Sequence, residues 1–403
     1  MSDITIYPSP LKGVVTPPPS KSITHRAIIC AAVSGGDCLI NNFRLSDDTK
    51  ATLNGMRALG SRFEVLSDKL FVKKCVRNVE ADIDCMQSGS TMRFLIPLAA
   101  ALGVTARFTG QGRLPERPLS DYEDILSEKG IIFKSRGGYL PAEVKGKLTG
   151  GVFRVSGKVS SQFISGLLMA IPMTGEGGEI VITDELESAP YADMTARVMA
   201  IFGVNASKTD KGYYIDASER YSPADYTIEA DYSQAAFFLV ANALGSDITI
   251  NGLSSDAMQG DKKIVELIEE LNASKDAVID AKDIPDLVPP LAVLCGLREG
   301  TAKIINAGRL RYKESDRLES TYSMMKELDA DIKLNADGFT ISGVKSYKGC
   351  RIDSFSDHRI AMAAAIAATK ADGPVKIIGA DCVTKSYTNF FDEFERLKGR
   401  IRR

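Results

Sequence analysis

The sequence predicts an α/β fold of two domains, each built from three copies of one βαβαββ-like unit. Three observations support this prediction. The 403 residues are more than one hydrophobic core usually supports. Strand-like apolar runs alternate with helix-like runs along the chain. One pattern, a Ser or Asp followed by small apolar residues and then Gly, recurs six times.

The first helix of each unit is the clearest repeated element. Successive opening residues lie 68, 71, 72, 53 and 71 positions apart. Because Ser and Asp favour N-caps and Gly favours a helix end, each segment is predicted to be a helix with defined boundaries. The six opening residues are Ser22, Ser90, Ser161, Ser233, Asp286 and Asp357.

The rest of each unit is also similar. A short apolar strand follows the first helix, then a polar loop and a second, amphipathic helix, as in "CLINNF" and "TLNGMRALG". Units one, two, three and five add a hairpin, such as 63–74 or 331–343. The fourth unit is short because only "DAVIDA" follows its second helix. The sixth ends after its second helix, and residues 3–9 are predicted to supply its missing strand.

The order of the units predicts where the domains divide. One domain is expected to comprise residues 19–229, and the other residues 1–18 plus 230–403, since the N-terminal strand belongs with the later units. The chain would then cross between domains near 17–19 and again near 226–231. Consecutive prolines at 17–19 restrict the chain to extended geometry, which favours a hinge.

Composition narrows the classes of function. The formal net charge is −2, so neither nucleic acid nor a membrane is expected as the main partner, and no stretch reaches transmembrane length. Seven scattered cysteines and an N-terminus without a signal pattern predict a cytoplasmic protein with no disulfide framework. Two histidines are too few for a histidine-rich metal centre.

The helix starts are predicted to form an anion site. Each presents unpaired backbone N–H groups and the positive end of a helix dipole, and the starts from both domains are expected to face a shared cleft. Their side chains are mostly basic or hydroxylic, as in "SKSITHR", "SGSTMR", "SSQ", "DIPD" and "SDHR". The loops before the second helices add "GRLPERP", "SAPY", "RYKESDR" and "VTKSY".

Each fragment taken alone has an ordinary structural explanation, such as helix capping or a surface turn. A P-loop is excluded because "SKSITHR" lacks the G-x-x-x-x-G spacing. Equivalent positions in one repeat nevertheless favour convergence. Converging cations would repel one another without a partner, so two anionic substrates or one multiply charged substrate are expected.

Through these motifs the chain resembles the 5-enolpyruvylshikimate-3-phosphate (EPSP) synthases, the 3-phosphoshikimate 1-carboxyvinyltransferases. The markers "SKSITHRA", "SGSTMR", "LPERP", "VSSQF", "DIPD", "RYKESDR", "SDHRIAM" and "TKSY" follow the family's order across essentially the whole chain. The resemblance implies the enolpyruvyl transferase fold, an inside-out α/β barrel. It also implies transfer of the enolpyruvyl group of phosphoenolpyruvate to the 5-hydroxyl of shikimate 3-phosphate, in chorismate and aromatic amino-acid biosynthesis. Phosphate is the second product, no cofactor is needed, and a monomer is expected.

The resemblance implies a role for each motif residue. Shikimate 3-phosphate would contact Lys21, Ser22, Arg26, Ser160, Ser161, Gln162, Ser188, Asp286 and Lys313. Phosphoenolpyruvate would contact Lys21, Gly89, Arg117, Gln162, Arg317, Arg359 and Lys385. Asp286 would accept the proton of the attacking hydroxyl, and either Glu314 or Lys21 would protonate the methylene carbon.

Three positions bear on how closely the chain follows the family pattern. Arg309 stands where Asn or Glu is common, which leaves one shikimate-phosphate contact open. His25 stands where Asn is common. Gly89 is retained, and it is expected to leave room for the inhibitor glyphosate.

Two other functions remain as alternatives. The related transferase that acts on UDP-N-acetylglucosamine shares the fold, but it typically carries a reactive cysteine in the loop that reads "GQGRLPERPLSDY" here. A non-catalytic anion-binding relative would not need paired carboxyl groups such as Asp286 and Glu314.

Overall fold

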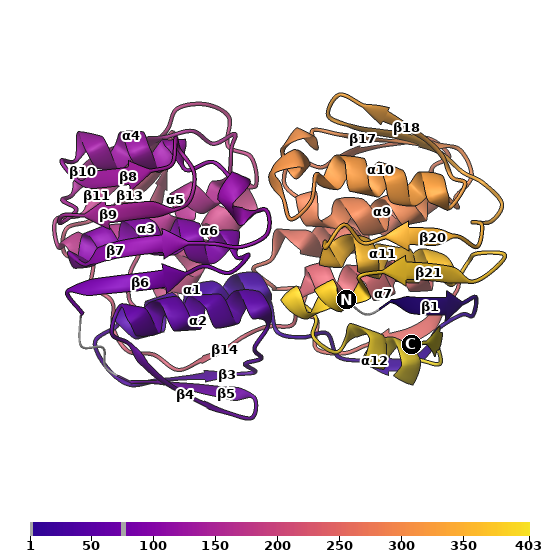
Figure 1. The fold of residues 1–403 in the computed structure, drawn as a ribbon, viewed down its shortest axis with the longest axis horizontal. Helices are drawn as coiled ribbons and strands as arrows, with labels where there is room; N and C mark the ends of the chain where they lie inside the picture. The colour runs from indigo at the N-terminus through magenta and orange to yellow at the C-terminus, as the bar shows by residue number, and fades with distance from the viewer. Residues whose placement is uncertain (1–2, 74–77) are drawn as a thin grey trace. The chain divides into compact units, whose positions relative to one another are not determined.

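The chain folds into two compact units. The structure, a computed structural model, describes residues 3–73 and 78–403. Unit 1 comprises Met1–Pro18 and Ala230–Arg403, and unit 2 comprises Pro19–Glu229. Figure 1 colours unit 2 from indigo to magenta, and most of unit 1 from orange to yellow. Cys75 and the last residue of the hairpin predicted over 63–74 lie outside the described residues.

Unit 2 contains three four-stranded sheets of one design. In each, a parallel pair of strands is extended by an antiparallel hairpin, in the orders β14-β3-β5-β4, β6-β7-β9-β8 and β10-β11-β13-β12. The last strand of the unit, β14, completes the first sheet beside β3. The strands are β3 Cys38–Asn41, β4 Arg62–Leu66, β5 Lys69–Lys73, β6 Glu80–Asp84, β7 Thr105–Thr109, β8 Ile132–Ser135, β9 Ala142–Lys145, β10 Gly151–Val155, β11 Gly178–Ile182, β12 Ala206–Thr209, β13 Gly212–Ile215 and β14 Tyr226–Thr227.

Unit 1 repeats the design once and varies it twice. The sheet β16-β17-β19-β18 matches those of unit 2, whereas β20-β21-β1-β22 and the pair β15-β2 both recruit strands from the N-terminus. The strands are β1 Ile4–Tyr7, β2 Lys12–Val15, β15 Asp247–Ile250, β16 Ala277–Asp280, β17 Thr301–Ile305, β18 Asp331–Asn335, β19 Gly338–Ser342, β20 Arg351–Asp353, β21 Val375–Ile378 and β22 Arg400–Arg402. The repeated units confirm the predicted α/β class.

The sixth unit is completed in a way that the sequence predicted only in part. Strand β1 pairs antiparallel with β21, which confirms that the N-terminal segment supplies a strand there. The prediction that this unit ends after its second helix is wrong, because β22 pairs with the other side of β1. The sequence "RIR" is too short to be recognised as a strand, because its one apolar residue, Ile401, lies between two exposed arginines on an edge strand.

Twelve helices are described, and they come in pairs of a first and a second helix per repeat. The first helices are α1 Lys21–Val33, α3 Gly89–Leu102, α5 Ser161–Ala170, α7 Tyr232–Ala243, α9 Val288–Cys295 and α11 His358–Ala368. The second helices are α2 Asp47–Ala58, α4 Ser120–Glu128, α6 Ala189–Ile201, α8 Ile264–Ala273, α10 Arg317–Glu327 and α12 Phe390–Arg396. The first helices are buried nearly all round, whereas the strands alternate between buried and more exposed residues.

Small residues let the first helices pack closely. A Cβ on Gly166 of α5 would lie 2.3 Å from both the Arg93 carbonyl oxygen of α3 and the Tyr122 hydroxyl. Residue 166 must therefore be Gly for α3 and α5 to approach each other as they do. With helices inside and sheets outside, each unit has the inside-out arrangement that the family resemblance implies.

The structure also bears on membrane association. Within residues 3–73 and 78–403, no helix has both the length and the apolar character required to span a membrane.

Candidate active site

The helix starts differ from the predicted capping register. The side chains that cap α1, α3, α5 and α7 belong to Ser20, Ser88, Ser160 and Asp231, one or two residues before the predicted opening residues. Asp357 does cap α11, as predicted. The shift leaves the hydroxyls of Ser90 and Ser233 free to accept hydrogen bonds from Gln162 and Arg359.

Asp286 does not cap a helix. It lies in the 3-10 turn Pro285–Leu287 before α9, and its carboxylate is used entirely for cations. Oδ1 lies 2.9 Å from Nη1 of Arg317 and 3.7 Å from Nζ of Lys313, and Oδ2 lies 2.7 Å from Nη2 of Arg359. The plain capping explanation for this residue is therefore wrong.

The pKa of Asp286 follows from these contacts. Burial alone would raise it, because a buried carboxylate loses hydration. The three cations, Arg359, Lys313 and Arg317, outweigh burial and hold the pKa of Asp286 far below its usual range. The group is therefore ionised at neutral pH.

Arg317 is the centre of unit 1's charged cluster. Its side chain is 1% exposed and touches three carboxylates: Asp286, Glu314 and Asp357. Nη2 lies 2.5 Å from Oε2 of Glu314, and Nε lies 2.9 Å from Oδ2 of Asp357. Burial alone would lower the pKa of Arg317. The three carboxylates outweigh burial and hold the pKa above its usual range, so the guanidinium stays charged.

Two lysines border this cluster. Lys385 is buried in the 3-10 helix Ala380–Lys385, with Nζ 3.7 Å from Oε1 of Glu314. Lys313 is about one-third exposed, at 30% of its side chain. Burial, helped by the nearby Arg309 and Arg317, lowers the pKa of Lys313 to about 8, despite the opposing carboxylates.

Arg309, the residue at which the chain departs from the family pattern, lies in the 3-10 helix Gly308–Tyr312. Its Nη2 donates to the carbonyl oxygen of Lys282 at 3.2 Å. Its charge also acts on Lys313, whose pKa it helps to lower.

In unit 2, Lys21 is tied to a carboxylate that the sequence analysis did not single out. Nζ of Lys21 lies 2.7 Å from Oδ2 of Asp48, and the two side chains are 17% and 7% exposed. Asp48 lies in the first turn of α2, in the loop "LSDDTK". That loop is the repeat equivalent of "RYKESDR", so the repeat itself was the signal that could have identified Asp48.

Arg26 is more deeply committed to the protein than the motif suggested. It is buried and makes four hydrogen bonds, to Thr195 Oγ1, Ser165 Oγ and the carbonyl oxygens of Ser22 and Tyr191. Burial lowers the pKa of Arg26 to about 10, which still leaves it charged at neutral pH. Arg26 thus holds α1 against α5 and α6.

The first turn of α3 lies against three polar side chains. A Cβ on Gly89 would lie 2.7 Å from Nη1 of Arg117, 3.4 Å from Oε1 of Gln162 and 3.7 Å from Nη1 of Arg93. Gln162 accepts from Arg93 at 2.9 Å and donates to Ser90 Oγ at 3.0 Å. The predicted residues Gly89, Arg117 and Gln162 are therefore brought together.

The hydroxyls predicted to bind phosphate lie at the starts of α5 and α6. Ser160 caps α5, and Ser161 is buried in its first turn. Ser188, also buried, precedes α6 with a φ of 57°, in the left-handed region. The start of α5 places the hydroxyls of Ser160 and Ser161 at the positive end of the helix dipole, which suits an oxyanion. At the start of α6, Pro190 has no N–H and the Tyr191 N–H donates to the Ser188 carbonyl oxygen at 3.0 Å.

The charge balance corrects the argument from unpaired cations. Each of the four cations of this cluster in unit 1 already forms an ion pair with a carboxylate. The cations are Lys313, Arg317, Arg359 and Lys385, and the carboxylates are Asp286, Glu314 and Asp357. Their repulsion therefore does not by itself require an anionic ligand. Asp357, which was seen in "SDHR" but not assigned a role, is fully buried and belongs to this network.

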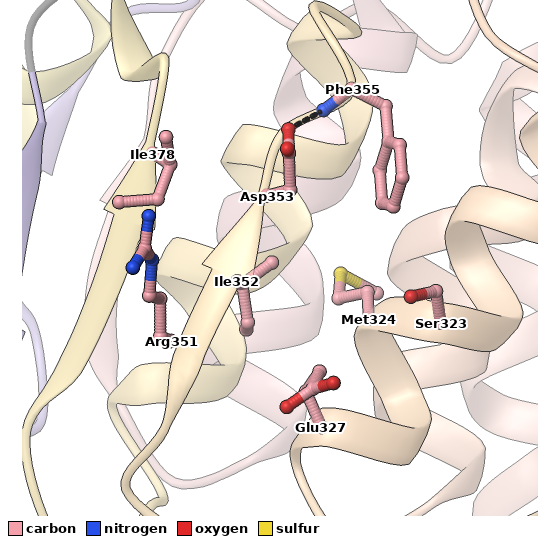
Figure 2. A pocket seen from close by; sticks show the side chains of 8 residues that line it. All are labelled: Ser323, Met324, Glu327, Arg351, Ile352, Asp353, Phe355 and Ile378. Carbon is pink, nitrogen blue, oxygen red and sulfur yellow. Dashed lines mark hydrogen bonds between the residues drawn. The ribbon is translucent and has the colours of Figure 1, made fainter.

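Unit 1 also has a cavity that is separate from the charged cluster. About 310 Å³ in volume, it lies between α10 and strands β20 and β21 of unit 1. Figure 2 shows its lining residues, Ser323, Met324, Glu327, Arg351, Ile352, Asp353, Phe355 and Ile378. Asp353 Oδ1 accepts from the Phe355 N–H at 2.7 Å. None of the predicted site residues lines this cavity.

Comparisons with known proteins agree with one another. A family model described as EPSP synthase (3-phosphoshikimate 1-carboxyvinyltransferase) matches residues 6–394. A 3-phosphoshikimate 1-carboxyvinyltransferase of Clostridium kluyveri is 43% identical over 419 residues, covering 100% of this chain and 98% of its own. One from Clostridium botulinum is 40% identical over 424 residues, covering 99% and 98%. The structure of EPSP synthase from Acinetobacter baumannii superimposes with a TM-score of 0.82 at 22% identity, covering 100% of both chains.

Proposed function

This chain belongs to the EPSP synthase family, 3-phosphoshikimate 1-carboxyvinyltransferase, and from this premise we propose how its residues carry out the reaction. The protein is an enolpyruvyl transferase. It joins the 5-hydroxyl of shikimate 3-phosphate to the enolpyruvyl group of phosphoenolpyruvate and releases inorganic phosphate. Two small anionic molecules are therefore the substrates.

Phosphoenolpyruvate carries a phosphate and a carboxylate, so its partners should be mostly cationic. We assign to it Lys21, Gly89, Arg117, Gln162, Arg317, Arg359 and Lys385. The lack of a side chain at Gly89 supports this assignment, because it leaves the Arg117 guanidinium room beside the first turn of α3. Arginine suits the task because its planar fork binds carboxylate or phosphate through two donors.

Shikimate 3-phosphate needs donors for one phosphate and partners for its hydroxyls. We assign to it Lys21, Ser22, Arg26, Ser160, Ser161, Gln162, Ser188, Asp286 and Lys313. The start of α5 at Ser161 supports the phosphate assignment, because its hydroxyls lie at the positive end of the helix dipole. Arg26 already donates four hydrogen bonds within the protein. Its contribution is therefore to orient Ser22 and Tyr191 and to supply a positive charge near the phosphate.

Asp286 is the proposed acceptor of the hydroxyl proton, and the ion-pair network around it carries the proposal. Its ionised carboxylate can accept a hydrogen bond from the attacking hydroxyl. In the network it is too weak a base to remove the proton, because its pKa is held so low. Bound anionic substrates would compete for Arg317 and Arg359 and so raise the pKa of Asp286 toward the range that general base catalysis needs.

The donor of the second proton has two candidates. Glu314 lies between Arg317 and Lys385, the two cations assigned to phosphoenolpyruvate, so it would lie beside that substrate. The ammonium group of Lys21 lies 2.7 Å from Asp48 Oδ2 and could donate directly. Both roles require that the group be protonated as the methylene carbon becomes a methyl group.

The chemistry balances as an addition followed by an elimination. In the addition, the hydroxyl oxygen bonds to C2 of phosphoenolpyruvate, its proton passes to the base, and C3 gains a proton from the acid. The resulting tetrahedral intermediate carries phosphate and carboxylate on one carbon. In the elimination, a C3 proton returns to the group that donated it, the bond from C2 to the phosphate oxygen breaks, and the departing phosphate takes the proton held by the base. This restores the double bond and both protein groups, with the cations positioning both anions throughout.

We further propose that the protein acts as a cytoplasmic monomer. The scattered cysteines of the sequence support a reducing compartment. Sedimentation at the concentration used for assays tests the oligomeric state.

The test is phosphate release from phosphoenolpyruvate with two acceptors in parallel, shikimate 3-phosphate and UDP-N-acetylglucosamine, with and without a chelator. We expect release with shikimate 3-phosphate alone and no effect of the chelator. Release with only the nucleotide sugar would assign the protein to the related transferase. Tight binding of shikimate 3-phosphate without any release would leave a non-catalytic anion-binding protein.

A further inference from the structure

A buried chain of hydrogen bonds connects three helices of unit 2. His25 of α1 lies 2.6 Å, through Nδ1, from Oγ1 of Thr52 in α2. That oxygen lies 2.6 Å from Oγ1 of Thr91 in α3, which lies 2.8 Å from Oγ of Ser88. All four residues are at most 1% exposed. None of them has a role in the reaction as proposed above.

The bond from Thr91 to Ser88 has a defined donor, and counting hydrogens from it orders the other two bonds. Thr91 is the donor to Ser88, so its single hydroxyl hydrogen is used there. Thr52 must then donate to Thr91, and Nδ1–H of His25 must donate to Thr52. This leaves Nε2 of His25 as a bare lone pair, and Nε2 meets no hydrogen-bond partner within residues 3–73 and 78–403. The histidine is neutral, since burial lowers its pKa to about 3.

The chain ends at the start of α3. Ser88 caps this helix by accepting the N–H of Thr91 at 3.2 Å, and the same oxygen accepts the Thr91 hydroxyl. The next two residues, Gly89 and Ser90, face Arg117 and Gln162. The position of the Ser88 cap therefore determines where the first turn of α3 lies relative to these side chains.

We propose that His25 is a positioning residue for phosphoenolpyruvate: through Thr52 and Thr91 it holds the cap and first turn of α3 in the register that Gly89, Arg117 and Gln162 require. The inference rests on the proposed function, which assigns those three residues to phosphoenolpyruvate. His25 itself touches no assigned substrate contact of α3, and it acts only through the two threonines.

The proposal requires a hydrogen-bond donor at position 25. Leucine is similar in size but offers no donor, so Thr52 would lose the partner that orients its hydroxyl. Asparagine places an amide nitrogen, a donor, one bond beyond Cγ, as the histidine places Nδ1. The pair His25→Leu and His25→Asn therefore separates the donor from the packing of the ring against Phe94, whose centroid lies 6.4 Å away.

The experiment measures KM for each substrate, kcat and thermal unfolding in the full-length enzyme. The variants are His25→Leu, His25→Asn, Thr91→Val and Thr52→Val, in which valine keeps the shape of threonine. The control is Ser34→Ala, which removes the buried hydrogen bond of 2.8 Å from the Ser34 hydroxyl to the Ala31 carbonyl oxygen, at the C-terminal end of α1. Wild-type activity with shikimate 3-phosphate tests the proposed function separately, and the inference is read only from ratios to wild type.

We expect His25→Leu, Thr91→Val and Thr52→Val to raise KM for phosphoenolpyruvate roughly 5- to 150-fold, the range for leaving one buried polar group unsatisfied. KM for shikimate 3-phosphate should change less than twofold, and His25→Asn should recover most of the loss. Ser34→Ala should lower the unfolding temperature without changing either KM. The inference is refuted if both threonine variants keep the wild-type KM for phosphoenolpyruvate. It is also refuted if His25→Asn is as impaired as His25→Leu. Should His25→Leu not fold, the two isosteric threonine variants decide the outcome.

Discussion

Replacing Gly89 by alanine is a direct perturbation of the proposed phosphoenolpyruvate contacts. The new Cβ would lie 2.7 Å from Nη1 of Arg117, whereas ordinary contact begins at 3.4 Å. The guanidinium must therefore retreat by about 0.7 Å, while Gln162 and Arg93 can stay in place. Gly89 does not have a positive φ, so the backbone accepts alanine without strain.

The expected effect is on substrate affinity. A misplaced charge-assisted hydrogen bond is worth about 1.5–3 kcal/mol, so KM for phosphoenolpyruvate should rise by roughly ten- to a hundredfold. KM for shikimate 3-phosphate and the unfolding temperature should stay close to wild type, because only the end of one flexible side chain moves. Inhibition by glyphosate should weaken in parallel if it occupies the same space.

Steady-state phosphate release, with each substrate varied in turn, measures this. Gly373→Ala is the matched control, since its Cβ would lie 3.5 Å from the nearest atom, in ordinary contact. An unchanged KM for phosphoenolpyruvate in Gly89→Ala would show that Arg117 does not bind this substrate. A loss of folded protein would show that the backbone at Gly89, and not Arg117, absorbs the new methyl group.

Three further predictions concern the charged groups. Asp357→Asn removes one carboxylate from the buried Arg317, so the free energy of unfolding, measured by denaturant titration, should fall by about 3 kcal/mol. The control Asp331→Asn, at an exposed position, should change it by less than about 0.5 kcal/mol. Equal losses in the two variants would contradict the claim that Asp357 stabilises Arg317. Lys313 has a pKa of about 8, so KM for shikimate 3-phosphate should rise between pH 7 and pH 9 as this ammonium group loses its proton, and Lys313→Arg should abolish the rise. His25 has a pKa of about 3 when folded and about 6.5 when unfolded, so the unfolded chain binds the extra proton between these values. Stability should therefore fall as pH decreases from 6.5, and a folded His25→Asn variant should show a smaller fall.

The repeat made the fold predictable where sequence pattern and burial coincide. Buried helices such as α3 and α11 are made of small apolar residues between a cap and a glycine or a turn, so both ends could be read from composition. The pairing of β2 with β15 could not, because it joins strands more than 200 residues apart by backbone hydrogen bonds alone. The edge strand β22 was missed because three residues with a single apolar side chain are too short a run to predict a strand.

The site was predictable as a set of residues but not as a set of contacts. Motif order indicated Asp286, Lys313 and Arg317, yet nothing in their spacing shows that Arg317 is shared among three carboxylates. Asp48 was missed because its partner Lys21 lies on another helix, 27 residues earlier. The order of donors from His25 to Ser88 likewise depends on angles that only the folded structure defines.

The central claim is that Asp286 is needed for proton transfer and not merely for binding. Asp286→Asn tests it most directly, with shikimate 3-phosphate affinity measured by calorimetry and turnover by phosphate release, and with Asp331→Asn as the control. The account predicts that affinity changes by less than about tenfold, the range of one hydrogen bond, while turnover falls by at least about a hundredfold. Turnover within tenfold of wild type in a folded Asp286→Asn variant would contradict the assignment of Asp286 as the base.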